Sequence, residues 1–374
     1  MDWVRGKVGR GTIIKRLSNA PAVTLRRLNR GVRVRIEVPP RRFLAVDIGF
    51  ELSNLCNLHC THCIRGSHQK TIEQLDLPLI RRVLDEATQL FGSIEVVFTG
   101  GEPLASDLFP DVVRELAQRR VPYRFVTNGW LVPRHLSLLQ AHPPRFVRVS
   151  LSGGTELTHD EQRGKGSFRR ALLGAAAVLS RGMVAELSLL LTKRSRAEIG
   201  DAVALAADLR ARALHLTLMQ PTPETAAGGL DLSPEEWREV TREVNAIAPH
   251  AIVPVVLDYG GPMPVPRERC NTLASRQLYI DARGCVPFCC QLSRYGNGGE
   301  QIIGDLRTES IAAIAARATQ IYDAFHEETG RLYQIGTLDA LDDFPCMSCA
   351  RRHGQTRFLE IFPDHPWAQL ARAS

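Results

Sequence analysis

Three cysteines near the start of the sequence are spaced closely enough to serve one metal centre. Cys56, Cys60 and Cys63 lie in the stretch ELSNLCNLHCTHCIRGSH, and the next cysteine is Cys270. Nine cysteines in a chain without a secretion signal are more typical of metal ligation than of disulfides, and an odd number leaves one unpaired. Three thiolates with no fourth nearby indicate a centre whose last position takes another ligand.

Two chemistries fit this loop. Zinc could bind the three thiolates, with His59 or His62 as the fourth ligand. Alternatively, the thiolates could bind three irons of a [4Fe–4S] cluster and leave the fourth iron open. S-adenosylmethionine (SAM) can chelate that iron through its amino nitrogen and carboxylate. An electron from the cluster then breaks a C–S bond and releases a 5′-deoxyadenosyl radical. The spacing alone leaves both chemistries open.

Alternating strands and helices must position this loop. Short apolar segments alternate with amphipathic ones, which predicts a parallel sheet with crossover helices, either an open (β/α)6 partial barrel or a doubly wound sheet. Ligands of such sheets bind at the carboxyl ends of the strands, where the cysteine loop and three further motifs fall. The predicted strands are 44–53, 94–100, 123–128, 146–152, 185–192 and 213–219, and the predicted helices are 74–91, 107–119, 132–140, 167–181 and 196–210.

Together these motifs resemble the radical SAM superfamily. They are C-x3-C-x2-C, then FTGGEP (98–103), VTNG (126–129) and VSLSGGTELTHDEQRGKGSF (149–168). The resemblance implies a catalytic [4Fe–4S] cluster on Cys56, Cys60 and Cys63. It also implies that Gly100 and Gly101 let the backbone approach closely. Glu102 would accept from the SAM ammonium group, Ser150 and Arg163 would hold its carboxylate, and Asn128 would lie near its sugar.

Two positions in these motifs stand out. His62 lies where the family often places an aromatic or similar ring beside the cluster, which is an alternative to its reading as a zinc ligand. Ser152 stands where many relatives with a second cluster domain have aspartate, so the assignment to a close subfamily stays open.

The remaining six cysteines lie near the end of the chain. They follow the Gly- and Pro-rich boundary at 258–270 and a predicted hairpin with its turn at 281–284. Their pattern resembles a SPASM or twitch domain, which implies an auxiliary [4Fe–4S] cluster, although four cysteines could also hold structural zinc. Cys285 or Cys290 could replace Cys289 as a ligand; otherwise they are small buried residues or catalytic thiols. The implied ligands are Cys270, Cys289, Cys346 and Cys349.

Charge divides the chain unevenly. Residues 1–42 carry twelve Lys or Arg and two acidic residues, a balance of +10, so the remaining residues account for +7 − 10 = −3. This basic arm could meet an acidic partner, or it could pair with acidic groups along the barrel. The predicted domains are an arm (1–43), a radical SAM core (44–258), a small α+β cluster domain (259–355) and a tail (356–374).

The resemblance implies an enzyme that abstracts a hydrogen atom from a substrate, with an electron donor such as flavodoxin or ferredoxin. The substrate could be a ribosomally made peptide or a small molecule such as a sugar or cyclitol alcohol. Peptide maturases of this class often carry a leader-binding domain before the barrel, and residues 1–43 are short for one. A non-catalytic zinc or nucleic-acid binding protein is the third possibility. No apolar run long enough to span a membrane is found, which favours the cytoplasm.

Overall fold

The computed structural model describes residues 46–64, 71–258, 277–290 and 301–372, and the backbone of three strands before them. Residues 1–45 and 46–374 form two compact units. The first unit contains an antiparallel sheet of β1 (Ile14–Lys15), β2 (Ala22–Leu28) and β3 (Gly31–Glu37), in that order. This sheet was not predicted, and it gives part of the basic arm a regular structure.

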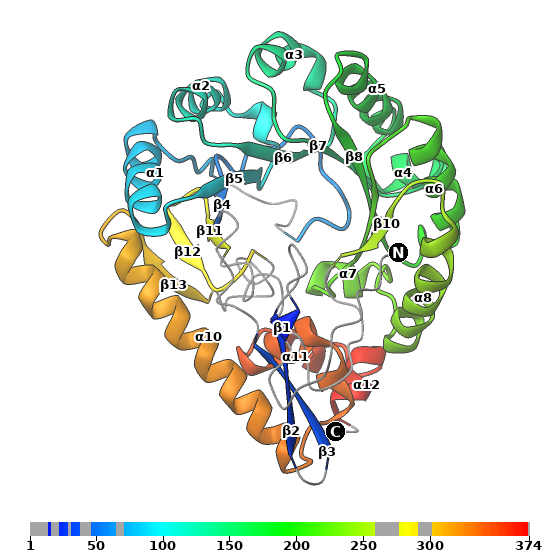
Figure 1. The fold of residues 1–374 in the computed structure, drawn as a ribbon. Helices are drawn as coiled ribbons and strands as arrows, with labels where there is room; N and C mark the ends of the chain where they lie inside the picture. Colours follow the sequence, from blue (N-terminus) through cyan, green and yellow to red (C-terminus); the bar gives the residue numbers. More distant parts are fainter. Residues whose placement is uncertain are drawn as a thin grey trace. The chain divides into compact units, whose positions relative to one another are not determined.

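The second unit is built on an eight-stranded parallel sheet in the order β10-β9-β8-β7-β6-β5-β4-β11. The strands follow a curve, with helices along its outer side (Figure 1), and this confirms the predicted partial barrel. The six predicted strands correspond to β4 (Val46–Glu51), β5 (Ile94–Thr99), β6 (Tyr123–Thr127), β7 (Val147–Leu151), β8 (Ala185–Leu191) and β9 (Leu214–Leu218).

Two further strands extend the sheet beyond the prediction of six. β10 (Val255–Leu257) pairs with β9, and β11 (Leu278–Ile280) pairs with β4. Each has three residues, too few to show a hydrophobic period in the sequence. The first strand of the barrel is therefore covered by a segment that comes more than 200 residues later in the chain.

The helices begin and end close to their predicted bounds. Asp76 caps the first one by accepting a hydrogen bond from the Leu79 N–H at 2.9 Å. A capping box starts α8, where the Ser233 and Glu236 side chains each accept a hydrogen bond from the other's backbone N–H. The helices of this part are α1 (Leu77–Phe91), α2 (Phe109–Arg119), α3 (Val132–Ala141), α4 (Glu156–Arg163), α5 (Ser167–Ser180), α6 (Ile199–Asp208), α7 (Pro223–Ala227) and α8 (Pro234–Ile247).

The main core lies between the sheet and the helices. Phe98 and Phe125 from neighbouring strands meet Phe109 of α2 edge to face, with ring centroids 5.4 and 5.5 Å apart. The opposite face of the strands is polar. Arg148 and Ser150 alternate with buried valine and leucine on β7, and Glu186 and Ser188 do the same on β8. The barrel interior is thus lined by charged groups at one depth and by hydroxyl groups nearer the carboxyl ends.

Beyond the barrel, the predicted hairpin is only partly right. The turn is present, because the Gly284 N–H donates to the Asp281 carbonyl at 2.9 Å. However, β12 (Cys285–Pro287) pairs with β13 (Ile302–Asp305), not with β11. The chain then forms α10 (Ile311–Gln334), α11 (Pro345–Arg352) and α12 (Pro366–Arg372).

Aromatic contacts join this last part to the barrel helices. The Trp237 ring of α8 packs against Phe344 and Trp367, with centroids 5.8 and 4.9 Å away. Trp367 is fully buried and its indole N–H donates to the Leu232 carbonyl at 2.8 Å. Residues 356–374, expected as a tail, thus include a helix that packs against α8. The division into domains at 258 and 355 stays a prediction.

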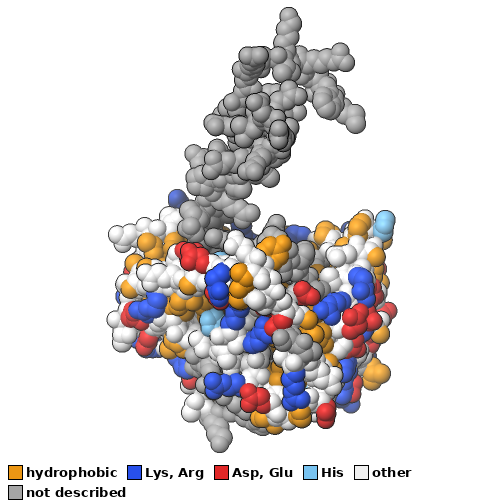
Figure 2. Space-filling model, turned by 90° about the horizontal axis from the view of Figure 1, so that it is seen from below, with side chains coloured by type: hydrophobic (Ala, Val, Ile, Leu, Met, Phe, Trp, Pro, Cys, Tyr) orange, Lys and Arg blue, Asp and Glu red, His pale blue; other side chains and the backbone are white. Residues whose placement is uncertain are grey.

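The described surface mixes both signs of charge. Figure 2 shows basic and acidic side chains interspersed over the face that it draws. Among the residues described, none of the helices combines the length and the apolar character needed to cross a membrane.

Candidate active site

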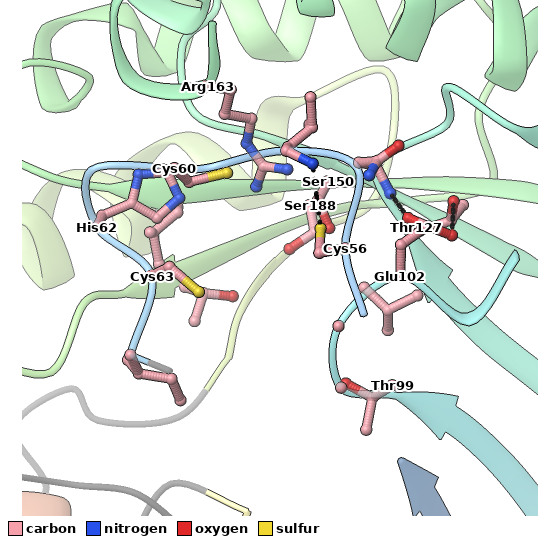
Figure 3. Close-up of a pocket in the computed structure, with 18 of the residues that line it drawn as sticks. Cys56, Cys60, His62, Cys63, Thr99, Glu102, Thr127, Ser150, Arg163 and Ser188 are labelled. Atoms are coloured by element: carbon pink, nitrogen blue, oxygen red, sulfur yellow. Dashed lines mark hydrogen bonds between the residues drawn. The ribbon is translucent and has the colours of Figure 1, made fainter. Parts of the chain in front are cut away.

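One cavity of about 350 Å³ opens among the ends of strands β5 to β9. Its lining includes hydroxyl groups from successive strands, among them Ser150, Ser188 and Thr217. Ser150 and Ser188 are the inward-facing residues of β7 and β8 described above. The cavity brings together nine residues that the sequence predicted to bind the catalytic cluster and SAM: Cys56, Cys60, Cys63, Gly100, Gly101, Glu102, Asn128, Ser150 and Arg163. Figure 3 shows Cys60, His62 and Cys63 on one stretch of the loop, with Cys56 nearer to Glu102 and Thr127.

Glycines hold the loop after β5 against the cysteine loop. Gly100 has φ of +110°, a conformation that favours glycine. A Cβ atom at Gly101 would lie 2.2 Å from the Leu55 carbonyl oxygen, directly before Cys56. The Glu102 N–H donates to that same oxygen at 2.8 Å. Glycine at these positions therefore sets the distance between the two loops.

The Glu102 carboxylate is buried and already accepts three hydrogen bonds. Oε1 accepts from the Thr127 hydroxyl at 2.8 Å and from the Leu104 N–H at 3.1 Å, and Oε2 accepts from the Asn128 N–H at 2.7 Å. Burial raises the pKa of Glu102, while these donors and the Arg163 charge oppose the rise. An ionised carboxylate has about four acceptor sites, so one remains for a donor in the cavity.

Arg163 ends α4 and faces the same cavity. Its Nε donates to the Ser152 hydroxyl at 2.6 Å, and that hydroxyl also lies 3.3 Å from Nε2 of His62. Ser152, noted above as a departure from aspartate, therefore links Arg163 to the cysteine loop. The Thr61 N–H also donates to the Gln162 carbonyl at 3.0 Å, so α4 holds the loop at a second point.

His62 is neutral in this setting. Burial lowers its pKa to about 3, and the charges of Arg163 and His159 contribute. The ring is 6% exposed, and its Nδ1 has no hydrogen-bond partner among the described residues. A buried polar atom of this kind ordinarily has a partner, so the loop offers a free acceptor or donor to a bound group.

Asn128 ties the loop from the opposite direction. Its Nδ2 donates to Oδ1 of Asn57 at 2.9 Å, and its own Oδ1 accepts from the Trp130 N–H at 2.9 Å. Its predicted place near a sugar stays a prediction, because both ends of its amide already bind the protein.

Two thiols of the loop carry raised pKa values. Burial raises the pKa of Cys56 to about 11, and burial also raises that of Cys60. Within the described ranges, no three Cys, His, Asp or Glu side chains converge on one point that would suit a metal ion. In a [4Fe–4S] cluster each cysteine binds a different iron, so the cluster prediction does not require such convergence.

The second set of cysteines is described in part. Cys270 lies outside the described residues. Cys346 and Cys349 lie within α11, and Cys289 follows β12. The ring of Phe288 lies 4.6 Å from that of His353, just past α11, so the segments carrying Cys289 and Cys349 are neighbours. Their roles as ligands stay predictions.

Several cavity residues were not predicted. Ser188 and Thr217 could have been found from strand alternation, which places Ser150 and Ser188 in direct register. Gln220, Tyr279 and Cys290 also line the cavity. Tyr279 donates to the buried Glu51 carboxylate at 3.0 Å. Its position depends on the pairing of β11 with β4, which no local pattern reveals.

Comparison with curated proteins finds similarity over about half of this chain. Mycofactocin maturase MftC from Mycolicibacterium smegmatis is 29% identical over 199 residues, covering 52% of this chain and 50% of that protein. AdoMet-dependent heme synthase from Methanosarcina barkeri is 30% identical over 179 residues, covering 47% and 51%. The chain thus spans about half the length of these curated relatives.

Solved structures share the fold over a longer range. Streptococcus suis SuiB bound to precursor peptide SuiA matches with a TM-score of 0.58, covering 73% of this chain and 65% of that one. The identity is 14%, so this likeness concerns the fold alone.

A model of the Radical SAM superfamily matches residues 50–206. This range contains the cysteine loop, the glycine-rich loop after β5 and Arg163, which the cavity brings together. Residues 50–206 are therefore a radical SAM domain.

Proposed function

We propose that this protein is an enzyme that cleaves SAM reductively and takes a hydrogen atom from a substrate in the same cavity. The observation that supports this most is the meeting of the three loop cysteines and all six predicted SAM-binding residues around one cavity. When bound, the cluster and SAM supply an electron and a carbon radical. The cavity volume of about 350 Å³ lies in the range of small-molecule sites.

The residues present fit such cofactors. Cys56, Cys60 and Cys63 would hold the cluster and leave one iron open. Glu102 has an acceptor site left for the SAM ammonium group, and Arg163 keeps guanidinium N–H groups beyond the one that binds Ser152. Two opposite charges in the lining of one cavity suit the two charges of an amino acid moiety.

We further propose that Cys270, Cys289, Cys346 and Cys349 hold one auxiliary [4Fe–4S] cluster. The contact between Phe288 and His353 supports it, because it brings the segments of Cys289 and Cys349 together. An electron donor such as flavodoxin or ferredoxin would reduce the catalytic cluster.

A peptide is the substrate class that the comparisons favour. One curated relative is named as a maturase, and the SuiB structure holds a precursor peptide. A second candidate is a small molecule, since another relative is named as a heme synthase.

Anaerobic reconstitution tests the proposal. The protein with iron, sulfide, SAM and dithionite should release 5′-deoxyadenosine, measured by mass spectrometry, and Cys60→Ala should abolish the release. A wild-type protein that binds iron yet forms no 5′-deoxyadenosine would overturn the proposal. Addition of a short peptide encoded beside this gene should give a mass change in the peptide; a change only in a porphyrin or sugar would favour the second candidate.

A further inference from the structure

One cysteine beyond the loop reaches the same cavity. Cys285, Cys289 and Cys290 lie within six residues of each other, and of these only Cys290 lines the cavity. It follows the turn and strand of β12, so it comes from outside the matched radical SAM domain. The proposed binding of the catalytic cluster and SAM uses other residues and leaves Cys290 without a role.

A buried amide in the cavity indicates a ligand besides the cluster. Gln220 follows β9, lines the cavity and is 5% exposed. Its Oε1 has no hydrogen-bond partner among the described residues. A buried acceptor without a partner is unfavourable, so this oxygen is positioned for a donor, such as an N–H, on a molecule in the cavity.

We propose that Cys290 is a catalytic thiol that donates a hydrogen atom to a carbon radical in this cavity, and that Gln220 holds the substrate by accepting an N–H. The inference rests on the proposed function. It deepens that function, because it assigns the fate of the substrate radical. A thiol suits this task because its S–H bond is weaker than the C–H bond that forms.

The atoms and electrons balance as follows. The Cys290 S–H bond breaks, a substrate C–H bond forms, and a thiyl radical remains on sulfur. One electron from a one-electron reductant and one proton from water restore the thiol; dithionite serves as the reductant in vitro, and a reduced iron–sulfur or flavin protein in the cell. The substrate loses one hydrogen and regains one, so its composition is unchanged while the configuration at that carbon can invert.

SAM alone provides a test that needs no substrate. In D2O the thiol becomes S–D, so a radical formed by SAM cleavage takes deuterium from Cys290 and yields monodeuterated 5′-deoxyadenosine. Cys290→Ala and Cys290→Ser should lose this label, because a serine O–H bond is too strong to donate. Cys285→Ser, at the start of the preceding strand β12 and not in the cavity lining, is the matched control and should keep the label.

Iron content and SAM affinity provide readouts that do not depend on turnover. Both Cys290 variants should keep the wild-type iron count and the wild-type Kd for SAM by equilibrium dialysis. A fall in iron would make Cys290 a cluster ligand and overturn the inference. Unchanged deuterium labelling in the variants would also overturn it. Failure of the wild-type protein to form any 5′-deoxyadenosine would instead contradict the proposed function.

Discussion

Replacement of Glu102 by glutamine should separate the charge of the proposed SAM site from its shape. The side chain is fully buried against three donors, from Leu104, Thr127 and Asn128. All three contacts place the hydrogen on the partner, as an ionised carboxylate requires. Glutamine keeps the volume, removes the charge and converts one oxygen to an NH2 group.

The structure gives the size of the effect. Because Oε1 accepts two hydrogen bonds and Oε2 one, the amide oxygen should face Thr127 and leave the Asn128 N–H opposite an NH2 group. One orphaned buried donor costs about 1–3 kcal/mol of folding stability. Loss of a charge-assisted bond to the SAM ammonium costs about 1.5–3 kcal/mol, or about 10–150-fold in affinity.

Thr127→Val is the matched control. It removes one hydroxyl, which donates to Glu102 and accepts from the Gly129 N–H at 3.0 Å, but it keeps the carboxylate charge of Glu102. Its loss of stability should resemble that of Glu102→Gln, whereas its SAM affinity should stay much closer to wild type. Equilibrium dialysis with SAM and urea unfolding measure the two quantities. If Glu102→Gln is folded and binds SAM as tightly as wild type, the assignment of Glu102 to the ammonium group is wrong.

Four further outcomes are expected. Replacing Cys346 and Cys349 by alanine should lower the iron count from about eight to about four while some SAM cleavage survives; an unchanged count would exclude them as ligands. Gly101→Ala should displace the cysteine loop and lower the iron content of the protein, because the new Cβ would meet the Leu55 carbonyl. Gly200→Ala is the control: it has open space around it in α6 and should be neutral or stabilising by up to about 1 kcal/mol in thermal unfolding. Burial raises the pKa of Glu186, but His215, Arg212 and Arg148 outweigh it and lower this pKa to about 2. The ionised carboxylate should therefore stabilise the fold above the ordinary pKa of 4.5, and this stabilisation should be lost as the pH falls toward 2. Glu186→Gln should be less stable than wild type in urea at pH 6 and should lose less further stability at pH 3, and a pH dependence parallel to wild type would contradict this. Removal of residues 1–43 takes away the paired strands β2 and β3 together. It should leave uncoupled SAM cleavage intact but remove the salt dependence of substrate turnover, because salt screens charges over about 8–10 Å. An insoluble product would show that the basic segment is structural.

The predictable part of this protein is the part with local periodicity. Six strands, five helices and the capping box at Ser233 all leave a repeating or adjacent pattern in the sequence. The loop motifs follow these strands directly, and the carboxyl ends of parallel strands meet at one edge. Their meeting in one cavity therefore follows from the sequence once the strands are placed.

The remainder depends on contacts between distant segments. The pairing of β11 with β4 brings Tyr279 to Glu51, 228 residues away, and nothing near either residue indicates it. The role of Ser152 was hidden for a different reason. Its hydroxyl contacts both Arg163 and His62, and this bridge depends on where the chain places α4 after β7.

The pairing of β11 with β4 has a consequence for attempts to isolate the radical SAM core. A chain ended at residue 258 would look like a natural cut, because a Gly- and Pro-rich stretch follows it. Yet that chain would lose β11 and leave the backbone of β4 without its neighbour on one side. Exposed strand edges of this kind recruit other chains. The buried Glu51 carboxylate would also lose the Tyr279 hydroxyl. The shortest stable core should therefore reach at least to Ile280, and a shorter one should aggregate.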